Sequence, residues 1–126
     1  MPLRRPAMRG LTIVVATEQV DRYRTALSLA AAQAAAGGTA RLFLNERAAS
    51  LLGAPAPLDD VGFASAGLPT LAQLQEEALA LGVRLIVCQS GLALVGIHAD
   101  SLDPRIETGG LVGIVTSLDG DRLTIA

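Results

Sequence analysis

The first third of the chain alternates a short aliphatic run with a longer segment of helical spacing. Leu11–Ala16 is a continuous run rich in β-branched residues, which predicts a strand buried on both faces. The next segment has apolar residues at spacings of three and four, which predicts a helix with one buried face. These residues are Val20, Tyr23, Leu27, Ala30 and Ala34. Gly37-Gly38 predicts the end of that helix and Ala40–Leu44 a second strand, so the segment forms a βαβ unit.

The middle of the chain is less regular before the pattern returns. A short helix is expected near Glu46–Leu52, and a loop marked by Pro55, Pro57 and Gly62 follows it. A second apolar stripe then predicts a helix, and Thr70 and Gln73 have the spacing of a capping box before it. The stripe consists of Leu71, Leu74, Ala78 and Leu81, and Gly82 closes it. Val83–Cys88 is a third aliphatic run and predicts a third buried strand.

The last third leaves two structures open. Ser90–Val95 is expected to be a short helix opened by a serine cap, and Asp103-Pro104 marks a turn. Residues 110–118 have apolar positions at helical spacing, yet they are β-branched and precede Asp119-Gly120, which is a strong hairpin signal. Helix and hairpin therefore both remain open for this segment. Leu123–Ile125 is a final strand in either case, and residues 10–126 form a single domain.

Composition adds an expectation about assembly. Hydrophobic residues make up 51% of the 126-residue chain, yet its aromatic residues are only Tyr23, Phe43 and Phe63. The core is therefore aliphatic, and so much aliphatic surface is hard to bury within one small domain. Exposed apolar patches usually mark contacts, so we expect a homo-oligomer, whether a dimer, a trimer or a hexamer.

Charge and hydropathy argue against nucleic acid and membrane as partners. Arg4, Arg5 and Arg9 form a basic N-terminal tail at residues 1–9, expected to be flexible, while the whole chain carries a net charge of −2. The remaining acidic domain has no electrostatic footprint for nucleic acid. No segment has the ~18 unbroken apolar residues of a membrane helix, and the tail lacks the apolar region of a signal peptide. We therefore expect a cytoplasmic protein that binds neither nucleic acid nor membrane.

Cys88 is the one cysteine and the best candidate for chemistry. It ends a predicted buried strand, and ligands of open α/β sheets bind outside the carboxyl ends of the strands. The amides of a following helix stabilise a thiolate, which is the nucleophilic form, and Gln89, Ser90 and Gly91 supply such amides and space for a small adduct. The alternative is that Cys88 is simply a small core residue.

The segment Cys88-Gln89-Ser90-Gly91, followed by Leu94-Val95-Gly96-Ile97, resembles the cysteine segment of DsrE/DsrF-like proteins. Ile106-Glu107-Thr108-Gly109-Gly110 resembles their short fourth strand and Gly-Gly turn, and the resemblance runs from about Leu11 over nearly the whole chain. Two departures are that Gly91 stands where relatives often have serine, and that the paired cysteines of some redox relatives are absent. The resemblance implies a three-layer α/β/α domain with a mainly parallel five-stranded sheet, usually assembled into oligomers. It also favours a helix for residues 110–118.

In sulfur-relay members of that family the matching cysteine carries a persulfide. The leading hypothesis is therefore a sulfur carrier or sulfurtransferase-like protein that uses Cys88 without a cofactor and exchanges sulfur with a donor or acceptor protein. The alternative is a non-catalytic small-ligand-binding or regulatory oligomer with a structural cysteine. Exposure of Cys88 discriminates between them: an exposed thiol beside free helix amides favours the carrier, and a thiol packed among aliphatic side chains favours the alternative.

Other candidate binding residues follow the remaining strands, and each has a plainer structural role as its alternative. Glu18 could orient a ligand or simply favour its helix, and Asn45 could bind a ligand or cap a helix. Thr108 and Gly109 could form an anion pocket with the Gly110 amide, or a plain turn. His98, the one histidine, is expected at the far end of the helix after Cys88. One cysteine and one histidine cannot form a closed zinc site, so no metal is expected.

Overall fold

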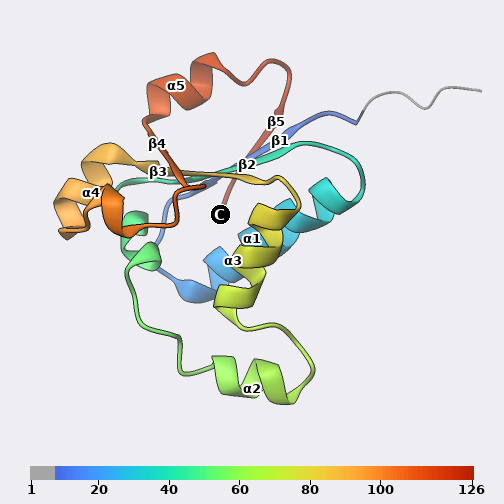
Figure 1. The fold of residues 1–126 in the computed structure, drawn as a ribbon. Coiled ribbons are helices and arrows are strands. Elements are labelled where there is room, and N and C mark those ends of the chain that lie inside the picture. The colour runs from blue at the N-terminus through green and yellow to red at the C-terminus, as the bar shows by residue number, and fades with distance from the viewer. Residues whose placement is uncertain (1–7) are drawn as a thin grey trace, which may run out of the picture.

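The computed structural model describes residues 8–126, which form one parallel sheet of five strands between layers of helices (Figure 1). The strands are β1 (Leu11–Val15), β2 (Ala40–Leu44), β3 (Arg84–Cys88), β4 (Glu107–Gly109) and β5 (Arg122–Ile125). Their order is β4-β3-β2-β1-β5, and every neighbouring pair is parallel. The predicted α/β class and five-stranded sheet are confirmed, and the sheet is parallel throughout.

Helices cover the two faces of the sheet unequally. Helices α1 (Val20–Ala35) and α3 (Leu71–Ala80) pack side by side on one face, while α5 (Leu111–Thr116) lies on the other (Figure 1). The sheet and its coverings make the three-layer arrangement that the family resemblance implied. The carboxyl edge carries the 3₁₀ helix η1 (Glu46–Leu52) and helix α4 (Gln89–Val95), which pack closely against each other.

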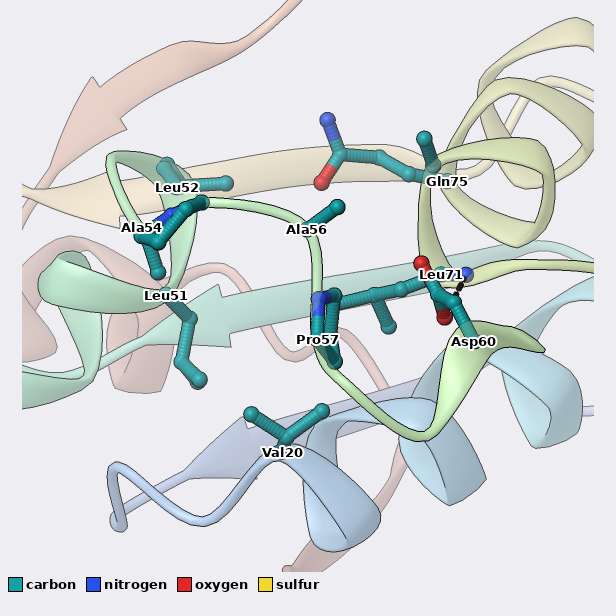
Figure 2. A pocket seen from close by; sticks show the side chains of 11 residues that line it. Val20, Leu51, Leu52, Ala54, Ala56, Pro57, Asp60, Leu71 and Gln75 are labelled. Carbon is teal, nitrogen blue, oxygen red and sulfur yellow. Dashed lines mark hydrogen bonds between the residues drawn. The ribbon is translucent and has the colours of Figure 1, made fainter. Parts of the chain in front are cut away.

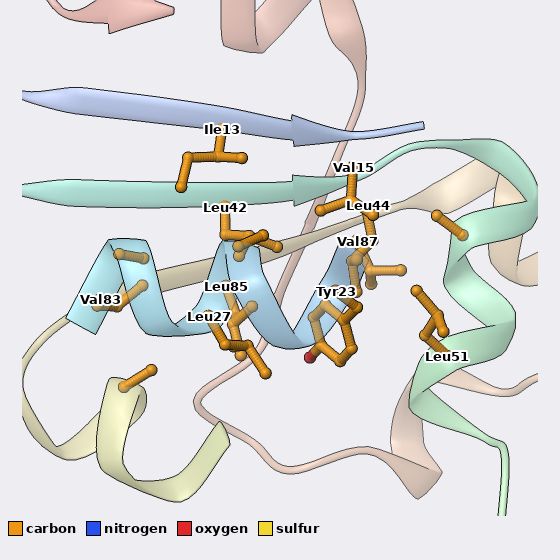
Figure 3. Packing of buried hydrophobic residues seen from close by; sticks show 14 of the residues in the cluster. Ile13, Val15, Tyr23, Leu27, Leu42, Leu44, Leu51, Val83, Leu85 and Val87 are labelled. Carbon is orange, nitrogen blue, oxygen red and sulfur yellow. The ribbon is translucent and has the colours of Figure 1, made fainter. Parts of the chain in front are cut away.

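The main core lies between the sheet and the helices α1 and α3. Strand residues that point toward these helices are completely buried, among them Val15, Leu42 and Leu85. Tyr23 and Leu27 of α1 pack against them (Figure 3). At about 25 cal/mol per Å² of apolar area removed from water, this aliphatic layer is the principal source of stability.

Local signals decide where several elements begin and end. Thr70 and Gln73 form the predicted capping box at the start of α3, with a hydrogen bond in each direction between side chain and backbone. Gly37 and Gly82 follow α1 and α3 with positive φ angles of 95° and 88°, a conformation that glycine adopts without strain. These helix boundaries agree with those expected from the sequence.

The structure corrects two expectations from the sequence and resolves a third. Residues 60–65, expected as a loop, form the short helix α2 (Asp60–Ser65), which has no buried residue. Helix α4 is capped by Cys88 and not by Ser90, because the chain becomes helical directly after the strand. The segment that was open between helix and hairpin is a helix, α5, and the chain then turns at Asp119-Gly120 into a parallel edge strand.

The N-terminal tail is described only from Met8 onward; Arg4 and Arg5 lie outside the described residues. Arg9, placed in the tail by the sequence, is held to the domain. Its Nε donates to the carbonyl of Gly120 at 3.0 Å, and its own carbonyl accepts from Gln33 Nε2 at 2.8 Å. In the part of the chain from residue 8 onward, no helix has the length and apolarity needed to cross a membrane.

Candidate functional site

Cys88 lies where β3 ends and α4 begins, at the carboxyl edge of the sheet. It is the N-cap residue of α4, and its Sγ accepts a hydrogen bond from the backbone N–H of Gly91 at 3.3 Å. The side chain therefore takes the place that serine or aspartate fills at many helix starts. This contact supplies one of the amide donors expected for a thiolate at this position.

The thiol is nevertheless packed among apolar side chains. Cys88 is 8% exposed and belongs to a small cluster on the α5 side of the sheet. The other members are Val14, Phe43, Ile86 and Ile114. Ile114 is the only one that comes from outside the strands, and it is also the only buried residue of α5. Access to Cys88 from this side therefore depends on how firmly α5 is held.

Gly91 has a steric reason to be glycine. A Cβ on Gly91 would lie 2.3 Å from the carbonyl oxygen of Glu46, which is backbone and cannot rotate away. Glu46 itself has a positive φ of 48°, unusual for a residue with a side chain. The close contact explains why this chain has glycine where the DsrE/DsrF-like proteins often have serine. It also brings the segment after β2 against the helix that follows Cys88.

The other predicted site residues are only partly brought together. Gly109 is the direct register partner of Cys88 in the β3–β4 pair, and Gln89 and Ser90 are exposed on the first turn of α4. Asn45 is half-buried at the start of η1, but its side chain makes no capping hydrogen bond. Glu18 is exposed between β1 and α1, two strands away from β3.

Two cavities border this edge of the sheet. One of about 420 Å³ is lined by Gln89, Thr108 and His98, together with apolar residues of α4. The smaller one, of about 150 Å³, is lined by Thr108, Gly109 and Gly110 together with Arg41 and Arg84. Cys88 lines neither cavity. The structure thus places Thr108 between both cavities and puts His98, expected far from the cysteine, in the same cavity as Gln89.

The arginines near the smaller cavity are already neutralised. Arg84 makes a two-pronged ion pair with Glu107, with bonds of 2.9 and 2.7 Å, which raises the pKa of Arg84 and lowers that of Glu107. Arg41 is buried and donates to Thr12 Oγ1, Ser117 Oγ and the carbonyl of Ile114. The anion pocket expected at Thr108 and Gly109 therefore has cationic walls whose donors are largely occupied.

The hydrogen bonds of Arg41, which connect α5 to the sheet, were not predicted from the sequence. Arg41 also lies 3.7 Å from the carboxylate of Asp121, and Thr12 Oγ1 donates to the same carboxylate at 2.9 Å. An arginine within an aliphatic strand was the available signal, since charged residues are rarely buried without a partner. Within residues 8–126, no three His, Cys, Asp or Glu side chains are grouped to hold a metal ion.

Comparison with known proteins supports the fold. No family model matches the chain, and no curated protein matches it by sequence. Among solved structures, the chain is similar to the crystal structure of the YchN protein from E. coli, with a TM-score of 0.66 and 21% identity. The match covers 94% of this chain and 98% of YchN. The chain has a DsrE/DsrF-like fold. At this level of identity, the likeness to YchN establishes the fold alone.

Proposed function

We propose that the protein is a sulfur carrier that holds a persulfide on Cys88. The observation that carries the proposal is the hydrogen bond from the Gly91 amide to Cys88 Sγ at the carboxyl edge of a parallel sheet. An amide donor at this point stabilises negative charge on the thiolate and on a persulfide anion. The DsrE/DsrF-like fold supports the proposal, because sulfur-relay proteins of that type use a cysteine in the matching segment.

The transfer that we propose conserves atoms and electrons. The Cys88 thiolate attacks the outer sulfur of a donor persulfide, the donor's S–S bond breaks, and the donor leaves as a thiolate. An acceptor thiolate then attacks the outer sulfur on Cys88 and releases the Cys88 thiolate. The chain has no second cysteine that could discharge the persulfide as an internal disulfide. A free thiol persists in a reducing compartment, so we place the protein in the cytoplasm.

The burial of Cys88 favours a second candidate function. A thiol that is 8% exposed within an apolar cluster is also what a structural cysteine would show. In that case the protein is a non-catalytic small-ligand-binding or regulatory oligomer. The two candidates differ in whether Cys88 accepts sulfur while the protein is folded.

Sulfur loading separates these candidates. The folded protein is incubated with a persulfide donor, freed of excess donor, and weighed by intact-protein mass spectrometry. The carrier gains the mass of one sulfur atom, which a later incubation with dithiothreitol removes. Cys88→Ser is the matched control and gains nothing. Wild-type protein that remains unmodified with several donors, yet loads after denaturation, would support the structural cysteine instead.

We also propose that the protein is a homo-oligomer and that the α5 side of the sheet forms a subunit interface. Leu123 and Ile125 of β5 pair in register with Thr12 and Val14, so they lie on the same face as α5. The residues on this side with exposed apolar side chains are Leu111, Val112, Val115, Leu123 and Ile125. An apolar patch of this kind is typical of a protein contact. Light scattering at micromolar concentration should report a dimer or a larger species, and a clean monomer would contradict the assembly.

A further inference from the structure

A cavity away from Cys88 has the features of a small-molecule site. Its volume is about 210 Å³, and it lies between the start of α1, the helix η1, the following loop and the first turns of α3 (Figure 2). An apolar cavity of about 150 Å³ is already large enough for benzene. None of the residues proposed above for sulfur chemistry lines it, so this inference stands apart from the proposed function.

The walls of the cavity are mostly apolar and locally stiff. Val20 and Leu51 lie on one side of it, and the loop carrying Pro55 and Pro57 borders it (Figure 2). Each proline ring fixes one φ angle and removes a backbone N–H. The loop therefore presents few unsatisfied donors to the cavity and resists collapse into it. A wall of this kind suits the apolar body of a small ligand.

Two polar side chains, those of Asp60 and Gln75, line the cavity and can orient a bound ligand. Asp60 Oδ1 accepts a hydrogen bond from the backbone N–H of Leu71 at 3.0 Å, which leaves Oδ2 as an available acceptor. The hydroxyl of Tyr23 donates to Gln75 Oε1 at 2.6 Å. Tyr23 is fully buried, and burial raises the pKa of its phenol, so that hydroxyl keeps its proton and remains the donor. Gln75 thus turns its Nε2 donors away from Tyr23.

Both groups meet α3 within one helical turn. Asp60 is held by the backbone N–H of Leu71, and Gln75 lies four positions later on the same helix face. Figure 2 shows the Gln75 amide reaching from α3 toward Ala56 and Leu52, with Asp60 beside Leu71. A ligand that satisfies both must offer a donor to Asp60 and an acceptor to Gln75.

We infer that this cavity binds a small primary amide with an apolar body. The amide N–H would donate to Asp60 Oδ2 and the amide oxygen would accept from Gln75 Nε2, while the apolar body lies against the aliphatic walls. A carboxylate would be repelled by Asp60, and an ammonium group would leave the Gln75 donor unpaired. The two side chains therefore select an amide over a carboxylate of the same shape.

Benzamide is a suitable probe, because its ring is the size of benzene and it carries one primary amide. Titration into ¹⁵N-labelled protein should shift the amide resonances of Ala54, Leu71 and Gln75 saturably, with a dissociation constant on the order of 1 mM. Benzoate and toluene serve as matched ligands and should each bind at least ~10-fold more weakly. Toluene binding as tightly as benzamide would overturn the selection by Asp60 and Gln75.

Two substitutions test the polar pair without changing its shape. Asp60→Asn keeps the oxygen that caps Leu71 but replaces the free oxygen by a donor. Gln75→Glu keeps the acceptor for Tyr23 but replaces the free donor by an oxygen. Each should weaken benzamide binding ~10-fold, while Asp59→Asn and Cys88→Ser should leave it unchanged. No saturable shift in the wild-type protein, or equal affinity in all variants, would overturn the inference, and unchanged resonances elsewhere would verify that the variants are folded.

Discussion

The two faces of the sheet differ in how they are covered by helices. The main core lies on one face, and the proposed chemistry lies on the other. On one face, α1 and α3 bury a continuous aliphatic layer in which Leu42 and Leu85 are fully inaccessible. On the other face, the six-residue helix α5 contributes one buried side chain, Ile114, to a cluster of five residues. Cys88, the proposed sulfur carrier, belongs to the second face. The face covered by α1 and α3 can supply the stability, so α5 can open in the free subunit without loss of the fold.

The largest predicted effect is on the face covered by α1 and α3. Leu42→Ala removes a fully buried side chain from the centre of the sheet and should lower the free energy of unfolding by about 2–5 kcal/mol, as measured by urea denaturation. Leu123→Ala, at a half-exposed position of β5 on the other face, should cost less than about 1 kcal/mol when measured on the dissociated subunit. Equal losses in the two variants would show that the faces do not differ in stability.

The second effect concerns the polar contacts that hold α5. Arg41→Met removes the donors to Thr12, Ser117 and the Ile114 carbonyl and should lower the free energy of unfolding by about 1–3 kcal/mol. Arg84→Met breaks an ion pair whose side chains are 55% and 44% exposed, and its effect should stay below about 1 kcal/mol. If both substitutions cost the same in urea denaturation, the buried network does not secure α5.

The smallest effect is the pH dependence of the Arg84–Glu107 pair. The hydrogen bond from Arg84 lowers the pKa of Glu107 below its ordinary value of 4.5. The pair therefore stabilises the fold above that value, and this contribution is lost as the pH falls through the lower pKa of the folded state. Wild-type protein should exceed Glu107→Gln in free energy of unfolding by at most about 0.5 kcal/mol at neutral pH, and this difference should shrink as the pH falls below 4.5. A difference that is constant over this range would rule out the ion pair as its source.

Much of the fold can be predicted from local patterns of hydrophobic residues in the sequence. Leu11–Val15 and Ala40–Leu44 are buried along their whole length, and their mostly apolar sequences, interrupted only by Thr12 and Arg41, predict central strands. Helix α5 was ambiguous because Val112, Ile114 and Val115 favour a strand locally while their spacing suits a helix. Helix α2 was missed because Gly62 lies within it and none of its residues is buried, so no apolar stripe marks it.

The candidate site was harder to predict because it depends on contacts between distant segments. The position of Cys88 at the end of a buried strand followed from the sequence, but its capping role and its cluster with Ile114 of α5 did not. The requirement for glycine at position 91 arises from the backbone of Glu46, 45 residues earlier in the chain. Local sequence patterns do not predict contacts between segments so far apart in the chain, and they do not predict the cavity lined by Asp60 and Gln75.

The proposed sulfur transfer requires Cys88 to react while the protein is folded. The denaturant dependence of thiol alkylation tests this requirement most directly. The rate of Cys88 modification by iodoacetamide is measured in guanidinium concentrations below the unfolding transition, for wild-type protein and Ile114→Ala. If a local opening of α5 exposes the thiol, the rate is nearly independent of guanidinium, and Ile114→Ala raises it ~10-fold or more beyond its effect on global stability. If the rate in both proteins instead rises with guanidinium as steeply as the unfolding equilibrium does, Cys88 is reached only by global unfolding and is a structural residue.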